Sequence, residues 1–314
     1  MLDLSIVIVS WNVRDLLRCC LASLTNGARS LAVETLVVDN ASSDGSAAMV
    51  RSDFPNAILI ENEENLGFTR ANNQALERST GRYVLLLNPD TEIVSDALRA
   101  MVSFMDGSPQ IGVLGPQLIF ADDTVQSSRR RFPDLRTLFV ESTVLQRFFT
   151  GSAMLRRFYV LDKPHDEVQD VDWVVGACLM ARREAAQAVG LLDEQFFMYS
   201  EEMDWCNRIK QKGWRVVYLP TAKVVHLEGR SSQQSVAAQH IYFQSSKVIY
   251  ARKYFGAPQA QALRLFLLAT YVLQIGAEGV KWLLGHKQGL RAERLAMYRA
   301  VLRSGLNVSG HYST

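Results

Sequence analysis

The stretch that most constrains the fold is a short apolar run that ends in polar residues. Five residues, Tyr83–Leu87, are followed at once by Asn88-Pro89-Asp90. An unbroken run of this length is typical of a strand buried on both faces, as in a parallel sheet covered by helices. Pro89 cannot donate to the ladder of a sheet, so we expect the strand to end there. Asn88 and Asp90 would then lie at the carboxyl end of a central strand, where open α/β sheets bind ligands. A carboxylate beside an amide can hold a divalent ion there, although an ordinary Asn-Pro-Asp turn is the alternative.

Three earlier apolar runs have the same form. Runs at residues 4–9, 33–38 and 57–60 alternate with helical patterns at residues 14–24, 46–50 and 69–78. Strands that alternate with helices in this way indicate a parallel sheet with right-handed crossovers. The polar residues after the strands should therefore meet at one edge of the sheet: Trp11, Asn12, Asp39, Asn40, Asn65, Asn88 and Asp90. Each alone is an ordinary turn residue, but their recurrence at four successive strand ends favours a binding cleft.

Composition and charge indicate a globular protein that does not bind nucleic acid. The chain has 314 residues, 48% of them hydrophobic, which is enough to bury a large core. Its net charge of +2 is unevenly placed, because residues 257–314 carry seven Lys and Arg against two Glu. The first 256 residues are therefore slightly acidic, and we expect no nucleic-acid partner.

Cysteine usage and the amino terminus bear on the compartment. The four cysteines, Cys19, Cys20, Cys178 and Cys206, match no zinc-binding spacing and are expected to be free thiols of an intracellular protein. A predicted strand begins directly after Met1-Leu2-Asp3, which leaves no room for a signal peptide. We expect a cytoplasmic protein.

A second acidic stretch, residues 193–208, carries a candidate proton acceptor. Ser200 is a suitable N-cap for a helix that begins at Glu201, and a helix N-terminus favours carboxylates. That alone explains the acids, but spacing of four and three residues puts Glu202 on the apolar face with Cys206 and Ile209. Burial would raise the pKa of Glu202 while the helix N-terminus lowers it, so Glu202 could be ionised and still accept a proton. We predict that Glu202 is a general base.

Other stretches of the second half leave more than one interpretation open. Residues 172–180 have strand character, and Gly176 is small enough to let a ligand approach the backbone. Arg129-Arg130-Arg131 could grip a diphosphate, or could simply be a solvated loop. Residues 214–220 and 222–226 are predicted as two strands, and His226 at their end has the position of a structural histidine as readily as that of a ligand.

Four motifs together carry a resemblance to a known family. They are Ser5–Asn12 (SIVIVSWN), Val37–Ser46 (VVDNASSDGS), Asn65–Asn73 (NLGFTRANN) and Asn88-Pro89-Asp90, in this order. The chain resembles family 2 glycosyltransferases, and within them the rhamnosyltransferase-like branch that acts on lipid-linked or cell-wall glycans. The resemblance covers about residues 4–256, and several motifs in one order are far more specific than any one of them.

The resemblance implies a fold and a set of site residues. The fold would be α/β of the GT-A type: a Rossmann-like, mostly parallel sheet flanked by helices, with a C-terminal helical extension. Residues 1–256 would form the catalytic domain, with a nucleotide-sugar half at 1–120 and an acceptor half at 121–256. Asn88-Pro89-Asp90 departs from the commoner Asp-x-Asp metal motif, which leaves Asp90 as the firm ligand. The implied donor contacts are Trp11, Asn12, Asp39, Asn65, Gly67, Arg70, Asn72, Asn88 and Asp90, with Asp39 on the base. The implied acceptor contacts are Trp173, Gly176, Asp193, Glu201, Asp204 and Trp205.

The implied reaction is an inverting, metal-dependent sugar transfer. Mg²⁺ or Mn²⁺, held by Asp90 and His226, would neutralise the leaving nucleotide diphosphate, while Glu202 deprotonates an acceptor hydroxyl. The donor would be a nucleotide-diphospho-sugar, with dTDP-rhamnose favoured by the family branch, and the acceptor a glycan or a lipid-linked molecule of cell-surface polysaccharide synthesis. Two alternatives remain open. A sugar nucleotidyltransferase should show a Gly-rich phosphate loop near the first strand, and none is present. A non-catalytic nucleotide-sugar-binding protein would not need an acid at position 202.

The basic segment 257–314 has two interpretations. It contains 13 uncharged residues, Leu265–Ala277, short of the roughly 20 needed to span a bilayer. With its excess of Lys and Arg it predicts one or two helices on an anionic membrane surface, which would make the protein peripheral on the inner face of the cell membrane. The alternative is a helical hairpin packed on the core or on a second subunit, as in a homodimer.

Overall fold

The structure is a computed structural model that describes residues 2–27, 31–227 and 236–307. Its contacts divide the chain into two compact units. The first unit comprises residues 1–132, 159–194 and 201–231, and the second comprises residues 133–158, 195–200 and 232–314. The boundary differs from the one expected at residue 256, because the helix before Gly256 buries Val248 and Ala251 against Leu263 and Leu267 of the helix after it.

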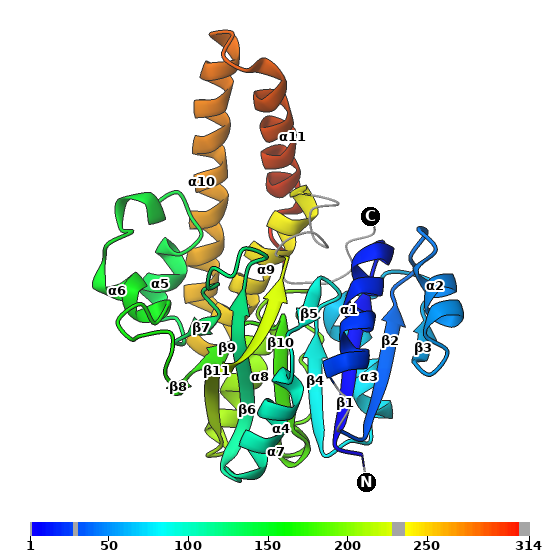
Figure 1. The fold of residues 1–314 in the computed structure, drawn as a ribbon. Helices are drawn as coiled ribbons and strands as arrows, with labels where there is room; N and C mark the ends of the chain where they lie inside the picture. Colours follow the sequence, from blue (N-terminus) through cyan, green and yellow to red (C-terminus); the bar gives the residue numbers. More distant parts are fainter. Residues whose placement is uncertain (1, 28–30, 228–235, 308–314) are drawn as a thin grey trace. The chain divides into compact units, whose positions relative to one another are not determined.

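The first unit contains a nine-stranded sheet in the order β3-β2-β1-β4-β10-β6-β11-β5, with β8 on β11 (Figure 1). Neighbouring strands β3, β2, β1 and β4 are parallel, and β10 is antiparallel to both β4 and β6, so β6 and β11 run in the direction of β4. The strands are β1 (Leu4–Ser10), β2 (Val33–Asp39), β3 (Ile58–Glu61), β4 (Tyr83–Leu87), β5 (Thr91–Ile93), β6 (Ile111–Ile119), β8 (Gln169–Val171), β10 (Cys178–Arg182) and β11 (Arg215–His226). A short second sheet pairs β7 (Arg129–Arg130) with β9 (Trp173–Val174).

Helices cover both faces of the sheet. Alternate residues of β1 point to opposite faces, so Ile6 and Ile8 belong to one core cluster and Val7 and Val9 to the other. The first cluster includes side chains of α1 (Arg14–Gly27), α2 (Ser46–Asp53) and α4 (Ala97–Asp106). The second includes side chains of α3 (Phe68–Arg78), α7 (Arg183–Val189) and α8 (Glu201–Gln211). This arrangement confirms the expected mostly parallel sheet flanked by helices.

The strands of the second half differ in detail from the prediction. The expected strand at 172–180 is two strands, β9 and β10, interrupted at residues 175–177. The two strands expected at 214–226 are one, β11, because Pro220 falls where the register against β6 shifts, and a proline is tolerated at such an irregularity.

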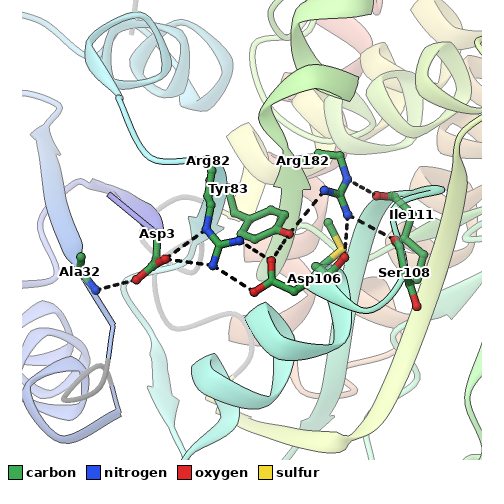
Figure 2. A network of polar contacts seen from close by, with 9 residues as sticks. Asp3, Ala32, Arg82, Tyr83, Asp106, Ser108, Ile111 and Arg182 are labelled. Carbon is green, nitrogen blue, oxygen red and sulfur yellow. Dashed lines mark hydrogen bonds and ion pairs between the residues drawn. The ribbon is translucent and has the colours of Figure 1, made fainter. Parts of the chain in front are cut away.

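A polar network lies where β4 begins and the antiparallel β10 ends, at the opposite end of β4 from Asn88 (Figure 2). Arg82 pairs with Asp3 and Asp106, and Tyr83 donates to Asp106 over 2.7 Å. Arg182 donates to the carbonyls of Met105, Ser108 and Ile111. These contacts fix the start of β4 and the end of β10. The carboxyl ends of the parallel strands are formed by other residues.

The second unit is helical. It contains α5 (Leu135–Val140), the 3-10 turn η1 (Gln146–Phe148), α6 (Ala153–Phe158), α9 (Val236–Phe255), α10 (Ala257–Leu283) and α11 (Gln288–Ser304). Tyr271 of α10 and Tyr298 of α11 meet in its core with ring centroids 5.6 Å apart. The basic tail is therefore a helical hairpin within this unit.

Candidate active site

The loop that follows β2 surrounds the side chain of Asp39. Its side chain is 4% exposed, and Oδ2 accepts a hydrogen bond from the backbone N–H of Ser42 over 3.0 Å. Its buried Oδ1 has no hydrogen-bond partner among the described residues. Asn12, with a left-handed φ of 52°, accepts from the N–H of Ser43 and so holds the same loop. Since an unsatisfied buried carboxylate oxygen is costly, Oδ1 of Asp39 is suited to accept from the N–H of a ligand such as a nucleobase.

Asn65 shapes the next exit with its side chain. Its Oδ1 accepts from Nδ2 of Asn40 over 2.8 Å and from the N–H of Gly67 over 3.0 Å. Asn40 also accepts from the N–H of Leu66. Gly67 has a φ of 84°, which a residue with a Cβ rarely adopts, and precedes α3. Asn65 and Gly67 thus lie together with Asn40, which follows β2. Asn40 was expected at this edge of the sheet but not among the residues that contact the nucleotide-sugar.

Two predicted donor residues of α3 have protein partners. Arg70 pairs with Glu194 at 3.3 Å, and Asn72 is buried with its Nδ2 donating to the carbonyl of Phe68 over 2.8 Å. The adjacent Asn73, which sequence analysis missed, exchanges two hydrogen bonds with the backbone of Leu192. These contacts hold the segment that leads to Asp193 against α3.

Asp90 and His226 come together because of the register between β5 and β11. Thr91 lies opposite His226 in that antiparallel pair, and the N–H of Leu227 donates to the carbonyl of Asp90 over 2.9 Å. The side chains of Asp90 and His226 are both buried, and Oδ1 of Asp90 lies 3.5 Å from Nε2 of His226. The other ring nitrogen, Nδ1, lies 2.9 Å from Oε1 of Gln126. Residues 90 and 226 are thus neighbours despite their separation in sequence.

The donor set at this pair fits a divalent metal ion. The carboxylate oxygen suits both Mn²⁺ and Mg²⁺, whereas the imidazole nitrogen is a ligand of transition metals and so favours Mn²⁺ of the two. No group of three His, Cys, Asp or Glu side chains that could hold a metal occurs in residues 2–27, 31–227 and 236–307. The described part of the protein would therefore contribute two ligands, and diphosphate oxygens and water would complete the coordination, as at many phosphate-bound metal sites. The side chain of Asn88 is partly exposed beside the pair, and its N–H donates to the carbonyl of Ala177.

Glu202 lies in the first turn of α8 against the break between β9 and β10. Its Oε1 is 3.4 Å from the N–H of Gly176, and its Oε2 is buried without a hydrogen-bond partner among the described residues. Burial raises the pKa of Glu202, and the backbone N–H groups of its own turn and of Gly176, with the charge of Arg130, offset part of that rise. These opposing effects are those expected from sequence. Gly176 contacts Glu202, and the carbonyl of the next residue, Ala177, accepts from the N–H of Asn88. Residues 176–177 therefore connect the first turn of α8 to the strand end that carries Asp90 two residues later.

Glu201, beside the half-buried Glu202, is a buried acid. It is 4% exposed, and its Oε2 also lacks a described partner. Burial and the charge of Glu202 hold its pKa well above the usual range. The charge of Glu202 is thus one of the two causes that raise the pKa of Glu201. Ser200 before them has a φ of 67°, so it is not in the extended conformation usual for the N-cap that we expected.

Other predicted acceptor residues divide between the surface and the core. Trp173 is partly exposed and donates from Nε1 to the carbonyl of Arg131 over 3.1 Å. Asp204 and Trp205 are fully buried: Asp204 pairs with Arg208 at 2.8 Å, and Nε1 of Trp205 donates to the carbonyl of Gly190. These contacts stabilise the packing of α8, and we leave Asp204 and Trp205 out of the acceptor contacts proposed below.

The three consecutive arginines lie in three different environments, so together they form neither a phosphate-binding site nor a solvated loop. Arg129 is buried and donates to Gln169 and to the carbonyl of Pro164, while Arg131 lies 3.7 Å from Asp172. The guanidinium of Arg130 lies 4.7 Å from the ring centre of Tyr159 and 5.9 Å from that of Trp173. Arg130 is the member of the three whose charge acts on Glu202.

Comparisons with known proteins agree on the class of the chain. The sequence profile described as Glycosyl transferase family 2 matches residues 5–163. The chain is 30% identical over 279 residues to the N-acetylglucosaminyl-diphospho-decaprenol L-rhamnosyltransferase of Mycobacterium tuberculosis, covering 83% of this chain and 89% of that protein. Its fold is similar to that of the mannosyltransferase PcManGT from Pyrobaculum calidifontis, in complex with GDP-Man and Mn²⁺, with a TM-score of 0.55 and 17% identity over 98% of this chain and 89% of that chain. It is also similar to GalNAc-T7 with UDP, GalNAc and Mn²⁺, with a TM-score of 0.57 and 16% identity over 80% of this chain and 48% of that chain.

Proposed function

Because this chain belongs to glycosyl transferase family 2 and has the GT-A fold, we propose that it is an inverting, metal-dependent sugar transferase whose base is Glu202. Membership of this family shows that the protein is a glycosyltransferase. The observation that supports the finer proposal is the backbone of residues 176–177, which contacts Glu202 through Gly176 and, through Ala177, Asn88 at the strand end that leads to the Asp90–His226 pair. An acceptor hydroxyl activated by Glu202 would there be close to a sugar whose diphosphate lies at Asp90.

Each side chain has a separate task in this mechanism. Asp39 would accept a hydrogen bond from the base of the nucleotide. The pocket for the sugar donor would be lined by residues of the loops after β1, β2 and β3 and by the start of α3: Trp11, Asn12, Asn65, Gly67, Arg70 and Asn72. A divalent ion bound at Asp90 and His226 would supply positive charge for the leaving diphosphate. Glu202 would take the proton of the attacking hydroxyl, since its raised pKa keeps it basic while the N–H of Gly176 orients it. Glu201, whose pKa is raised, could in its protonated form donate a hydrogen bond to the acceptor.

The substrates that we propose come from the relatives. The relative from Mycobacterium tuberculosis is named as an L-rhamnosyltransferase that acts on a decaprenol-linked diphosphate sugar. We therefore propose a rhamnose donor, with dTDP-rhamnose as the first candidate, and a lipid-linked or glycan acceptor of cell-surface polysaccharide synthesis. Trp173, Gly176, Asp193 and Glu201 would contact that acceptor, and Mn²⁺ or Mg²⁺ would serve as the ion.

The helical hairpin is proposed to lie on an anionic membrane surface on the cytoplasmic side. Helix α10 is long and apolar enough to cross a bilayer, a property that core helices of soluble proteins share. Large apolar side chains are exposed along it at helical spacing, among them Leu265, Val272 and Val280, and Leu283 and Leu284 are more than 75% exposed at its end. Lys281, Arg291 and Arg294 surround the buried Glu278 nearby and leave the hairpin basic. Apolar side chains with basic neighbours suit anionic lipid headgroups better than a second copy of this basic hairpin.

A thermal-shift screen tests the donor and the metal together. A ligand that binds only the folded state raises its melting temperature by mass action. One nucleotide-diphospho-sugar should stabilise the wild type in the presence of Mn²⁺ or Mg²⁺, and the shift should disappear with EDTA or in Asp90→Asn. Stabilisation that is equal with and without metal would remove the metal from the proposal. A positive donor shift with no transfer to any acceptor would favour the sugar-nucleotide-binding alternative.

A further inference from the structure

We propose that Gln126 is a positioning residue that holds His226 in the tautomer with its proton on Nδ1, so that Nε2 faces Asp90 as a bare lone pair. The inference rests on the proposed function, because it gives His226 a ligand's role. It adds a residue that the sequence motifs do not include and that touches no substrate.

The directions of two hydrogen bonds lead to this assignment. Nε2 of Gln126 donates to the backbone carbonyl of His226 over 2.6 Å. That bond fixes which end of the amide is the N–H₂ group, so the other end, Oε1, is the atom that lies 2.9 Å from Nδ1 of His226. An amide oxygen can only accept, so Nδ1 carries the proton. In a neutral imidazole the remaining nitrogen, Nε2, is then an acceptor.

The consequence appears on the other side of the ring. Nε2 of His226 and Oδ1 of Asp90, 3.5 Å apart, are then two electron-pair donors with no proton between them. Two such atoms repel each other unless a cation lies between or beside them. Metal-bound histidines characteristically donate their second ring N–H to an oxygen that sets the tautomer and the ring orientation, and Gln126 has that geometry.

The backbone around Gln126 fixes its amide in turn. A tight turn at residues 120–124 follows β6, closed by the hydrogen bond from the N–H of Phe120 to the carbonyl of Thr124. The N–H of Gln126 then donates to the carbonyl of Leu118 over 2.9 Å. Since β6 is parallel to β11 with Ile119 opposite Val225, this turn returns the chain beside the end of β11. Gln126 is 7% exposed there.

The competing explanation is an ordinary ion pair. If His226 carried protons on both nitrogens, it would bind Asp90 directly and Gln126 would only satisfy the end of a strand. The two explanations differ in the protonation of Nε2 in the metal-free protein. They differ also in what loss of Gln126 does to metal binding.

Long-range ¹⁵N–¹H spectra of the metal-free full chain at pH 8 read the tautomer directly. The His226 signal is identified by its absence from His226→Asn. We expect the Nδ1–H form in the wild type. Gln126→Glu loses the N–H₂ that donates to the carbonyl of His226 but keeps an acceptor for Nδ1, so Nδ1 should stay protonated. We expect a shift toward the Nε2–H form in Gln126→Leu. An Nε2–H or doubly protonated ring in the wild type, or a Gln126→Glu protein in which the proton has moved to Nε2, overturns the proposal.

Titration of each protein with Mn²⁺ alone, followed by electron paramagnetic resonance, reads the consequence for the metal. We expect Gln126→Leu to weaken Mn²⁺ binding by about 10- to 100-fold. The matched control is Gln117→Leu, a buried glutamine of β6 whose Nε2 donates to Tyr218 and to the carbonyl of His165, and it should leave the affinity unchanged.

The outcomes separate this proposal from the proposed function. Unchanged Mn²⁺ affinity in Gln126→Leu, with affinity lost in His226→Asn, would reject the role of Gln126 and keep the metal site. No effect of His226→Asn or Asp90→Asn would reject the metal site and the positioning role with it. If Gln126→Leu does not fold, the tautomer in Gln126→Glu still decides.

Discussion

The backbone N–H of Gly176 lies 3.4 Å from Oε1 of Glu202, and a Cβ built on Gly176 would lie 3.4 Å from Cγ of the same side chain. The contact places a half-buried acid of α8, with a buried Oε2 atom, against the loop between β9 and β10. It also links this acid to the carboxyl end of β4, since the next residue, Ala177, accepts from the N–H of Asn88. The predictions below follow from this arrangement.

Glu202→Gln should reduce the turnover rate by about 10²- to 10⁴-fold, the usual contribution of a general base. The amide keeps the shape of the side chain but cannot take a proton. Donor binding, measured as a thermal shift with nucleotide-sugar and Mn²⁺, should persist. Glu184→Gln, an exposed glutamate in the first turn of α7, is the matched control and should transfer at the wild-type rate. A Glu202→Gln enzyme with wild-type turnover would show that the base is another group.

The pH profile of kcat/KM should fall on the acid side with an apparent pKa above the ordinary glutamate value of about 4.3. Burial raises the pKa of Glu202, and only the ionised form can accept a proton. Initial rates between pH 4 and 9 in buffers of constant ionic strength measure this limb. Rates that stay level down to pH 4 would be inconsistent with a buried base.

Glu201→Gln should stabilise the protein, and more so as pH rises. The pKa of Glu201 is raised in the folded state, so its contribution to stability is fully present below the unfolded pKa and is lost as pH rises through the folded pKa. Glutamine imitates the protonated acid at every pH. The melting temperature of Glu201→Gln should therefore match the wild type near pH 4 and exceed it at pH 8. A difference that shrinks with rising pH would contradict the assigned direction of the shift.

Asp39→Asn should weaken nucleotide binding by about tenfold or more, because a buried hydrogen bond to a charged group contributes about 1.5–3 kcal/mol. Asparagine can still accept from the N–H of Ser42, so the loop should keep its shape. Calorimetric titration with dTDP, UDP and GDP measures the loss and shows which base the site prefers. Asp53→Asn, at the end of α2, serves as the control. Equal affinities in Asp39→Asn and the wild type would place the base elsewhere.

Leu283→Glu combined with Leu284→Glu should release the protein from vesicles that contain anionic lipid. Both side chains are exposed at the end of α10, and a carboxylate there is repelled by anionic headgroups and cannot enter the acyl region. Co-sedimentation with phosphatidylglycerol vesicles measures binding, and zwitterionic vesicles show the electrostatic share. Val168→Glu, at an exposed apolar position of the first unit, should have no effect. If instead the double variant changes only the oligomeric state, the hairpin is a subunit interface.

The first half of the fold could be predicted closely because its signals are local. Strands β1, β2, β3 and β4 are short, mostly apolar runs followed by polar residues, and the structure has them within one residue of the predicted bounds. Parallel pairing then places their exits together, as the bonds of Asn12 with Ser43 and of Asn40 with Asn65 show. Periodicity also predicted that Cys206 and Ile209 are buried beside Glu202.

The rest depended on pairings that no local pattern contains. Gln126 reaches His226 only because the chain turns back after β6, and a glutamine in a polar segment gives no sign of that. Trp205 is buried and donates to the carbonyl of Gly190, fifteen residues earlier, whereas the family resemblance implied that it contacts the acceptor. The break at residues 175–177 is likewise set by tertiary contacts, since Gly176 faces Glu202 and Ala177 binds Asn88.

The network of Arg82, Tyr83, Asp106 and Arg182 holds the start of β4 and the end of the antiparallel β10, away from the carboxyl ends of the parallel strands, where the proposed chemistry takes place (Figure 2). Burial by itself raises the pKa of Asp106, but Arg82 and Tyr83 outweigh it and hold that pKa low, so this stabilisation persists at neutral pH and fades only in acid. Natural variation at these positions would therefore change how much folded enzyme a cell maintains without altering the speed of each molecule. Selection for heat tolerance and selection for a new sugar could then proceed at opposite edges of the same sheet.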